Sequence, residues 1–272
     1  MFLADYHVHT AFSDDAQGSM EAHVRAAVDR GITELCFTDH TDDCCIGEVL
    51  SCVHRPYTRW MENARAQFTA LQEKYAGQIT LRFGHELGAP NHDPVAGEKI
   101  AADPLVDFII GSVHHVRGWN DIYYMHFDSA HMVRRLMEPY LAECLETARC
   151  GFCSVIGHIG YLRKYLHTQG YTLDLNDYTD QLTEIFKTAV QNGVGIEVNT
   201  SGLRCSVQSL APTPDILRLY RACGGEIITA GSDSHTPGDT GAEIRDAYDA
   251  LRAAGFRYVT TFIKRKPQFI KL

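Results

Sequence analysis

The sequence lacks the features that would direct a protein into a membrane, out of the cell or onto a nucleic acid. No apolar stretch approaches the ~18 residues of a membrane-spanning helix, and the first residues lack the basic and apolar segments of a secretory signal. Basic residues are not in excess either, because 25 Lys and Arg stand against 34 Asp and Glu, for a formal net charge of −9. We therefore expect a cytoplasmic protein that is not a general binder of nucleic acids or membranes.

The cysteines lack the pattern of a disulfide framework or a zinc finger. Nine are present, an odd number at irregular spacing, and the pair in Cys150-Gly-Phe-Cys153 has no second pair to complete a zinc site. Since no export signal is visible, we expect reduced thiols. We interpret Cys150 and Cys153 as plain thiols at a helix-to-strand junction, and Cys44, Cys45 and Cys52 as surface thiols.

Short apolar runs alternate along the chain with longer amphipathic ones, which indicates repeated strand and helix units. The expected strands are Leu3–His9, Glu34–Thr38, Thr80–Glu86, Phe108–Val113, Ser154–Gly157, Gly195–Asn199 and Glu226–Ala230, with Tyr258–Phe262 as a late eighth. The expected helices are Met20–Arg30, Arg59–Tyr75, His131–Arg149, Asp177–Asn192, Pro214–Cys223 and Gly241–Ala254. Glycines at the expected helix ends suit the C-cap position: Gly31, Gly77, Gly151, Gly193, Gly224 and Gly255.

No linker or charge block divides these units. Their number predicts a parallel α/β barrel, with an open doubly wound sheet as the alternative. In both folds, ligands bind beyond the C-terminal ends of the strands.

Histidine is abundant, with 14 residues, and it recurs where the expected strands end. Six of the first seven strands deliver imidazole or carboxylate there, and only the one ending Glu197-Val-Asn199 has no histidine. The residues are His7, His9, His40, Glu86, His114, His158, Asp233 and His235, with Asp14 and Asp15 in the first loop. A single such histidine is more often an ordinary hydrogen-bonded residue, but independent histidines have no reason to recur at successive strand ends.

The spacing of these residues suits metal ions. Residues i and i+2 of a strand point to the same side, so His7 and His9 can reach one ion, as can Asp233 and His235 if the extended conformation continues. Imidazole and carboxylate are ligands of Zn, Fe and Mn, and the set is too large for one tetrahedral ion. We expect two or three divalent ions with Glu86 as a bridging carboxylate. Because the ligands come from both ends of the chain, we also expect a single domain over residues 1–272.

The ordered set of motifs resembles the PHP (polymerase and histidinol phosphatase) superfamily, and more closely its histidinol-phosphatase branch. The segments that carry the resemblance are Asp5-Tyr-His7-Val-His9-Thr10, Thr38-Asp39-His40, Gly84-His-Glu86, Gly111-Ser-Val-His114-His115, Gly157-His158, Glu197-Val-Asn-Thr-Ser-Gly202 and Gly231-Ser-Asp233-Ser-His235. The resemblance implies a distorted, TIM-like (β/α)7 barrel with up to three Zn, Fe or Mn ions at the C-terminal ends of its strands.

The resemblance also implies how the ligands are shared. One ion would be held by His7, His9, Glu86 and Asp233, and a second by Glu86, His114 and His158. The third would take His40, His235 and a group from the first loop, for which we favour Asp15 over Asp14.

Further residues are expected around a small phosphomonoester substrate. By resemblance, Arg163 would lie near the phosphate, with Lys164 and Arg204 as alternatives. We expect His115 and Ser232 beside the substrate, and Trp119, Tyr123, Tyr124 and Tyr161 around its organic half.

The resemblance implies a phosphatase that hydrolyses L-histidinol phosphate in histidine biosynthesis. The two ions sharing Glu86 would hold a bridging hydroxide that attacks phosphorus, and Asp233 would orient this hydroxide and accept its proton. His235 would act beside them, although a ligating imidazole is a poor acid. Two alternatives stay open: a phosphoesterase of the same superfamily that acts on nucleotides, sugar phosphates or oligonucleotide ends, and a metal-storing or metal-sensing protein without turnover.

Overall fold

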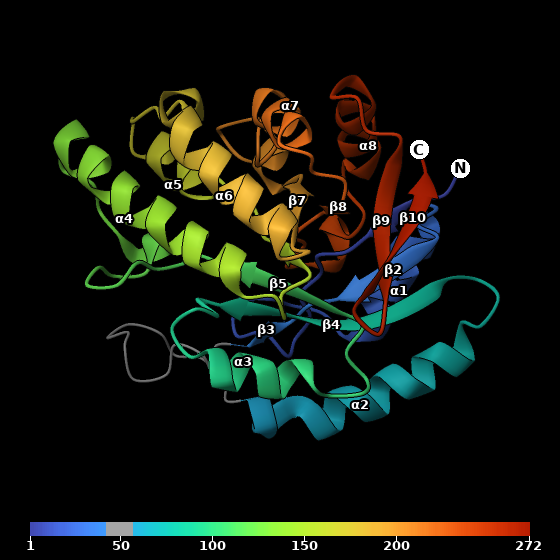
Figure 1. The fold of residues 1–272 in the computed structure, drawn as a ribbon. Helices are drawn as coiled ribbons and strands as arrows, with labels where there is room; N and C mark the ends of the chain where they lie inside the picture. Colours follow the sequence, from blue (N-terminus) through green and yellow to red (C-terminus); the bar gives the residue numbers. More distant parts are fainter. Residues whose placement is uncertain (42–56) are drawn as a thin grey trace.

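A parallel sheet that curves into a barrel, with helices outside it, forms the body of the protein (Figure 1). The computed structural model describes residues 1–41 and 57–272. The expected surface thiols Cys44, Cys45 and Cys52 lie outside the described residues. None of the helices within the described ranges is long and apolar enough to cross a membrane.

The barrel strands run parallel and follow one another around the sheet. They are β1 (Ala4–Asp5), β2 (Glu34–Phe37), β3 (His40–Thr41), β4 (Thr80–Gly88), β5 (Phe108–Ser112), β6 (Val155–Ile156), β7 (Gly195–Asn199) and β8 (Ile228–Gly231). The order is β1-β2-β4-β5-β6-β7-β8, with β3 paired to β4. The end strands meet, because the Tyr6 N–H donates to the Ala230 carbonyl at 2.9 Å and Val8 forms a parallel bridge with Ser234. The barrel is confirmed and the open-sheet alternative is wrong.

The helices lie outside the sheet. They are α1 (Met20–Asp29), α2 (Tyr57–Lys74), α3 (Pro94–Ala101), α4 (Ala130–Arg149), α5 (Leu162–Thr168), α6 (Thr179–Gln191), α7 (Pro214–Ala222) and α8 (Ile244–Ala253). In Figure 1, α2 and α3 cover one side of the barrel and α4, α6, α7 and α8 cover the opposite side. The six expected helices are confirmed to within a turn at each end.

Three parts of the chain differ from the expectation. Helices α3 and α5 were not expected, because eight and seven residues give too few turns for an apolar period to be visible. The late strand β9 (Tyr258–Ile263) does not join the barrel but pairs antiparallel with β10 (Lys266–Lys271). The expected glycine caps have positive φ except Gly151, because α4 ends instead on Cys150 with φ −77° and ψ 78°.

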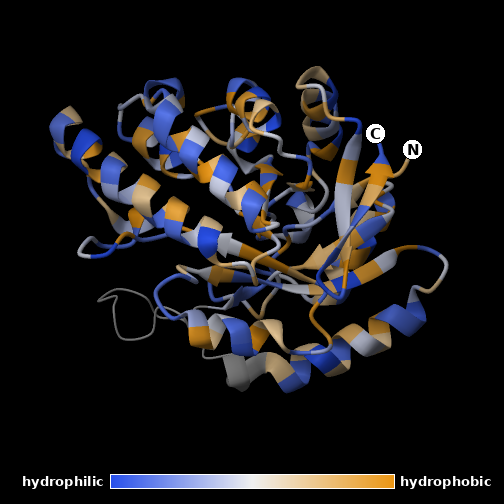
Figure 2. Ribbon diagram, viewed as in Figure 1, coloured by the Kyte–Doolittle hydropathy of each residue, from blue (hydrophilic) through white to orange (hydrophobic). Residues whose placement is uncertain are grey.

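The N-terminal end of the barrel is closed by apolar side chains. The Tyr6 ring lies 4.9 Å from that of Phe108, and Phe262 of the hairpin lies 5.1 Å from Phe108 between ring centroids. In Figure 2, hydrophilic and hydrophobic residues alternate along the helices outside the barrel. The opposite, C-terminal end of the barrel is where polar side chains collect.

Candidate metal centre

Imidazole and carboxylate side chains converge at the C-terminal ends of the strands, around a cavity of about 430 Å³. The cavity is lined by most of the expected ligands, which are Asp15, His40, Glu86, His114, His158, Asp233 and His235. The two histidines that follow β1, His7 and His9, are completely buried beside them. The sequence therefore predicted which side chains gather at this end of the barrel.

Glu86, near the end of β4, lies at the centre of the cluster and is 1% exposed. Five imidazoles surround its two oxygens: His7, His9 and His40 at Oε2, and His114 and His158 at Oε1. The nitrogen-to-oxygen distances run from 2.8 Å for His158 Nε2 to 3.3 Å for His9 Nε2. Both carboxylate oxygens are thus available to be shared between different groups of ligands.

Asp233 lies across the cluster from Glu86. Its Oδ1 lies 3.6 Å from Nε2 of His7, Nε2 of His9 and Nδ1 of His235. The extended conformation does not continue here, because Asp233 has a φ of +53°. The turn nevertheless leaves both Asp233 and His235 facing the same cavity.

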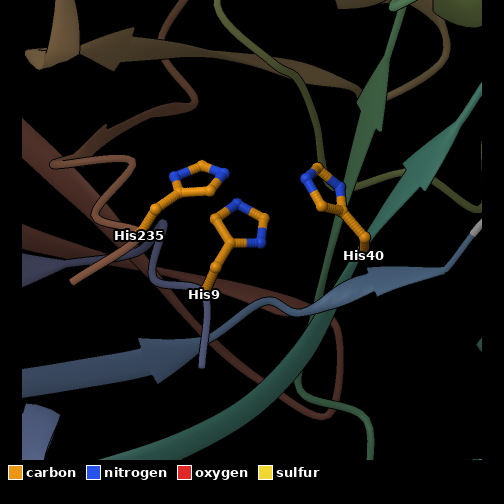
Figure 3. A group of neighbouring side chains, drawn as sticks. All are labelled: His9, His40 and His235. Carbon is orange, nitrogen blue, oxygen red and sulfur yellow. The ribbon is translucent and has the colours of Figure 1, made fainter. Parts of the chain in front are cut away.

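The first loop contributes Asp15 to the cluster. Its Oδ2 lies 3.2 Å from His235 Nε2 and 3.5 Å from His40 Nε2. Figure 3 shows His9, His40 and His235 with their rings gathered together, although they come from three separate segments. Asp14 also lines the cavity, but it is the carboxylate of Asp15 that lies beside these two histidines.

The distances between the candidate ligand atoms fit divalent ions. Ligands at ~2.0–2.1 Å from a tetrahedral zinc ion lie about 3.3 Å apart, and Nε2 of His114 lies 3.3 Å from Nε2 of His158. Nε2 of His7 and Nε2 of His9 are buried and make no hydrogen bond within the described residues. Groups of such atoms within 4.8 Å of one another include His9, His40 and His235, and also His7, His9 and Asp233. This donor set could therefore hold metal ions.

The electrostatics of the cluster favour positive charge. Burial opposes ionisation of Glu86 and Asp233, but the surrounding imidazoles, His7 foremost, hold the pKa of both carboxyls well below their usual values. Burial likewise opposes a proton on His7, yet Glu197, Glu86 and Asp233 raise its pKa well above the usual value. Carboxylates that favour an extra proton on an imidazole favour a divalent cation for the same reason.

Several buried groups that the sequence analysis did not single out support the ligands. Glu197 Oε1 on β7 lies 2.7 Å from His7 Nδ1. Ser112 donates to Glu86 Oε1 at 2.6 Å, and the Ser13 hydroxyl lies 3.2 Å from His9 Nδ1. The signal was present for Glu197, because it and Asn199 share one face of a strand that ends at the same rim.

Two of the residues expected beside the substrate do not line the cavity. Ser232 is buried and donates to Asp5 Oδ2 at 2.6 Å. His115 is 2% exposed, with its ring centroid 5.1 Å from that of His92. Both positions are adjacent in sequence to candidate ligands that line the cavity, but their own side chains are buried away from it.

The basic candidates differ in what they contact. Arg163 donates to the Leu173 carbonyl at 3.2 Å and to the Ser209 hydroxyl at 3.3 Å, outside the cavity. Arg204 donates to Glu243 at 2.5 Å and forms a further bond with the Ser232 carbonyl. Of the three basic candidates, Lys164 is the one that lines the cavity.

Aromatic residues form the wall above the cluster. The Tyr161 ring centroid lies 4.8 Å from that of His158 and also 4.8 Å from that of Tyr165. Tyr123 and Tyr124 are 60% and 63% exposed at the cavity. Trp119, which was expected here, does not line it and lies instead against Arg135.

Comparison with known proteins agrees with this geometry. A relative from Deinococcus radiodurans, named probable histidinol-phosphatase, is 29% identical over 288 residues and covers 98% of both chains. The histidinol-phosphatase of Lactococcus lactis is 26% identical over 261 residues, covering 95% of this chain and 93% of its own.

Solved structures share the fold. The crystal structure of histidinol phosphate phosphatase from Lactococcus lactis, complexed with zinc, L-histidinol and phosphate, has a TM-score of 0.80 at 24% identity and covers 98% of both chains. Residues 5–201, from the last residue of β1 to just beyond β7, match the model of the PHP domain. With its barrel, its histidine motifs and most of its length matched in this way, the chain belongs to the PHP domain family.

Proposed function

We propose that this protein is a metal-dependent phosphomonoesterase that hydrolyses L-histidinol phosphate to L-histidinol and phosphate. The proposal depends on one observation. Imidazoles and carboxylates line a cavity in this chain, and the chain matches relatives named histidinol-phosphatase over nearly its whole length. The structure with a similar fold from Lactococcus lactis was solved with zinc, L-histidinol and phosphate, which agrees with this substrate.

We propose two to three Zn, Fe or Mn ions as cofactors. The residues that would hold them are His7, His9, Asp15, His40, Glu86, His114, His158, Asp233 and His235. Such ions would lower the pKa of a water molecule and neutralise phosphate oxygens. The cluster distances of about 3 to 3.6 Å support this assignment.

Asp233, Glu86 and His235 are the proposed catalytic residues. Asp233 lines the cavity and is ionised at neutral pH, because nearby imidazoles keep its pKa well below the usual value despite burial. Its charged carboxylate would orient the attacking water by accepting a hydrogen bond from it, because a carboxylate of such low pKa is a weak base. Glu86 orients the imidazoles around it, and His235 lies 3.6 Å from Asp233 Oδ1.

Lys164 is our first candidate for the substrate phosphate, ahead of Arg163, because its side chain lines the cavity. An ammonium group there neutralises part of the phosphate dianion as a point charge. We no longer assign His115 and Ser232 to substrate binding. Their proposed role is to support the neighbouring ligands His114 and Asp233 from behind the cavity.

The organic half of the substrate would contact Asp121 and the tyrosines that line the cavity. Asp121 is 6% exposed and lines the cavity beside Tyr123, Tyr124 and Tyr165. A carboxylate between aromatic rings favours an ammonium or imidazolium group over a neutral sugar or an anionic nucleotide. This arrangement distinguishes histidinol phosphate from the other phosphomonoesters considered above.

The test compares kcat/KM of the zinc-loaded protein on histidinol phosphate, AMP, a sugar phosphate and p-nitrophenyl phosphate. Histidinol phosphate should be preferred by ~10²-fold or more, which is about 2.7 kcal/mol in transition-state binding. Asp121→Asn should lose most of this preference while it keeps turnover of p-nitrophenyl phosphate, and Asp233→Asn should lose turnover of every substrate. A wild-type preference for AMP or the sugar phosphate would refute the proposed substrate.

We further propose that residues 1–272 act as one domain, since candidate ligands after β1 and after β8 share the cavity. A cytoplasmic location is proposed with it. None of the six described cysteines forms a disulfide, which agrees with a reducing compartment.

A further inference from the structure

Strand β7 offers no metal-ligand candidate, yet its Glu197 contacts two of them. Glu197 is 1% exposed. Its Oε1 lies 2.7 Å from His7 Nδ1, and its Oε2 accepts the backbone N–H of His158 at 2.8 Å and the side-chain amide of Asn199 at 3.2 Å. One carboxylate therefore joins the histidine after β1 to the histidine after β6.

The contact with His7 determines which ring nitrogen carries the proton. A carboxylate only accepts hydrogen bonds, so Nδ1 of His7 must be the donor in this pair. When an ion replaces the second proton of the ring, the lone pair that binds it is therefore the one on Nε2, which lies 3.2 Å from Glu86 Oε2 and makes no hydrogen bond within the described part of the chain. Nε2 is the atom that the proposed metal site requires as a ligand.

The contact with His158 positions the backbone rather than the ring. His158 has a φ of +21°, a value that residues with a Cβ adopt rarely. The hydrogen bond from its N–H to Glu197 stabilises this turn, and the turn directs Nε2 of His158 to within 2.8 Å of Glu86 Oε1. Glu197 thus aligns two ligands that meet opposite oxygens of Glu86.

We infer that Glu197 is a positioning residue that selects the ligating tautomer of His7 while it fixes the backbone of His158. The inference rests on the proposed metal site but not on the identity of the substrate. It assigns a role to the strand whose end lacks histidine.

Replacement of Glu197 by glutamine separates this role from packing. Glutamine has the same shape as glutamate, but only one of its two terminal atoms is a hydrogen-bond acceptor. Two donors, the His158 N–H and the Asn199 amide, converge on Oε2. The glutamine oxygen is therefore expected on that side, with its NH2 group toward His7. Nδ1 of His7 must then accept, and the proton moves to Nε2, which can no longer ligate an ion.

The experiment measures Zn²⁺ binding to wild type and Glu197→Gln by chelator competition and by elemental analysis after dialysis. We expect the variant to bind its weakest-held zinc ion at least ~10-fold less tightly, as is typical when a partner of a ligating histidine is lost. The metal-free forms should melt at similar temperatures. Glu143→Gln is the matched control, since this buried carboxylate accepts hydrogen bonds from Asn91 and the backbone of Arg117, outside the cluster. It should bind zinc as the wild type does.

A second measurement uses the wild-type protein alone, so it does not depend on whether a variant folds. In zinc-loaded wild type labelled with ¹⁵N-histidine, the His7 ring should give the signature of a protonated Nδ1 and a ligating Nε2. A proton on Nε2, zinc affinity unchanged in Glu197→Gln, or no zinc binding by wild type would each overturn the inference. If zinc binding depends on Glu197 but histidinol phosphate is not hydrolysed, the proposed substrate fails and this inference stands.

Discussion

Gly231, the last residue of β8, leaves the space in which His7 and Glu197 meet. A Cβ built on Gly231 would overlap both Glu197 Oε1 and the Cβ of His7. Neither neighbour can move freely, because each is buried and hydrogen-bonded to the other at 2.7 Å. The glycine is thus required by close packing next to the proposed metal ligands.

Gly231→Ala should destabilise the protein by ~1–3 kcal/mol, the usual result of overpacking. It should also weaken zinc binding, because the added methyl group displaces the His7 ring. Gly238→Ala is the control from the same loop, since its Cβ would meet only the Thr236 hydroxyl at 3.6 Å. Urea unfolding and zinc titration measure both effects. A Gly231→Ala protein with wild-type stability and zinc affinity would contradict this account.

At the residue scale, strand periodicity predicted which side chains form the cluster, but it did not predict the contacts of the residues around the cluster. It predicted that His7 and His9 face one point, and both lie within 3.3 Å of Glu86 Oε2. It could not predict that Ser232 donates to Asp5, because that contact joins residues 227 positions apart. Nor could it rank Arg163 against Lys164, which are neighbours on α5 and differ only in the direction of their side chains.

At the element scale, amphipathic helices were predictable because each has one face packed on the barrel. The hairpin was not, because Tyr258–Ile263 has the apolar character of a barrel strand but pairs with β10. Phe262 inserts from this hairpin beside Phe108 and Tyr6 at the N-terminal end of the barrel. An apolar run indicates burial, whereas the partner strand depends on how the whole chain folds.

The junction between α4 and β6 carries the Cys150 and Cys153 thiols, which the sequence predicted to be plain. Both are buried and neither forms a disulfide. Burial, helped by Glu146, raises the pKa of Cys150 to about 11. Because only the thiolate is nucleophilic, about 10⁻³ of this thiol is reactive at pH 8.

Alkylation by iodoacetamide at pH 8, followed by peptide mass spectrometry, should therefore label Cys223 and Cys205 well before Cys150. Both are partly exposed. The rate at Cys150 should rise with pH until the pH passes about 11, as the thiolate fraction grows. Labelling of Cys150 at the rate of Cys223, or a disulfide between Cys150 and Cys153, would contradict the assignment of plain thiols.

At the scale of the whole molecule, the cluster joins segments from most of the barrel. The candidate ligands follow β1, β5, β6 and β8 or lie on β3 and β4, so any ion they share links distant parts of the chain. The protein as a whole carries a formal charge of −9. The carboxylates of Glu86 and Glu197 are buried and that of Asp233 is partly buried in the same region, where cations offset their mutual repulsion.

Removal of metal should therefore lower the stability of the entire barrel. A ligand that binds only the folded state stabilises it by about 2.7 kcal/mol at a free concentration of 100 times its Kd. For a chain of this size, each kcal/mol corresponds to ~2–4 °C, so chelation should lower Tm by roughly 5–10 °C. Calorimetry in the presence of a chelator and over a series of zinc concentrations measures this shift.

The control variant Glu86→Gln, which removes the shared carboxylate, should melt at nearly the same temperature with and without zinc. If the wild type also melts at the same temperature in both conditions, the cluster does not bind zinc, because binding to the folded state must raise Tm.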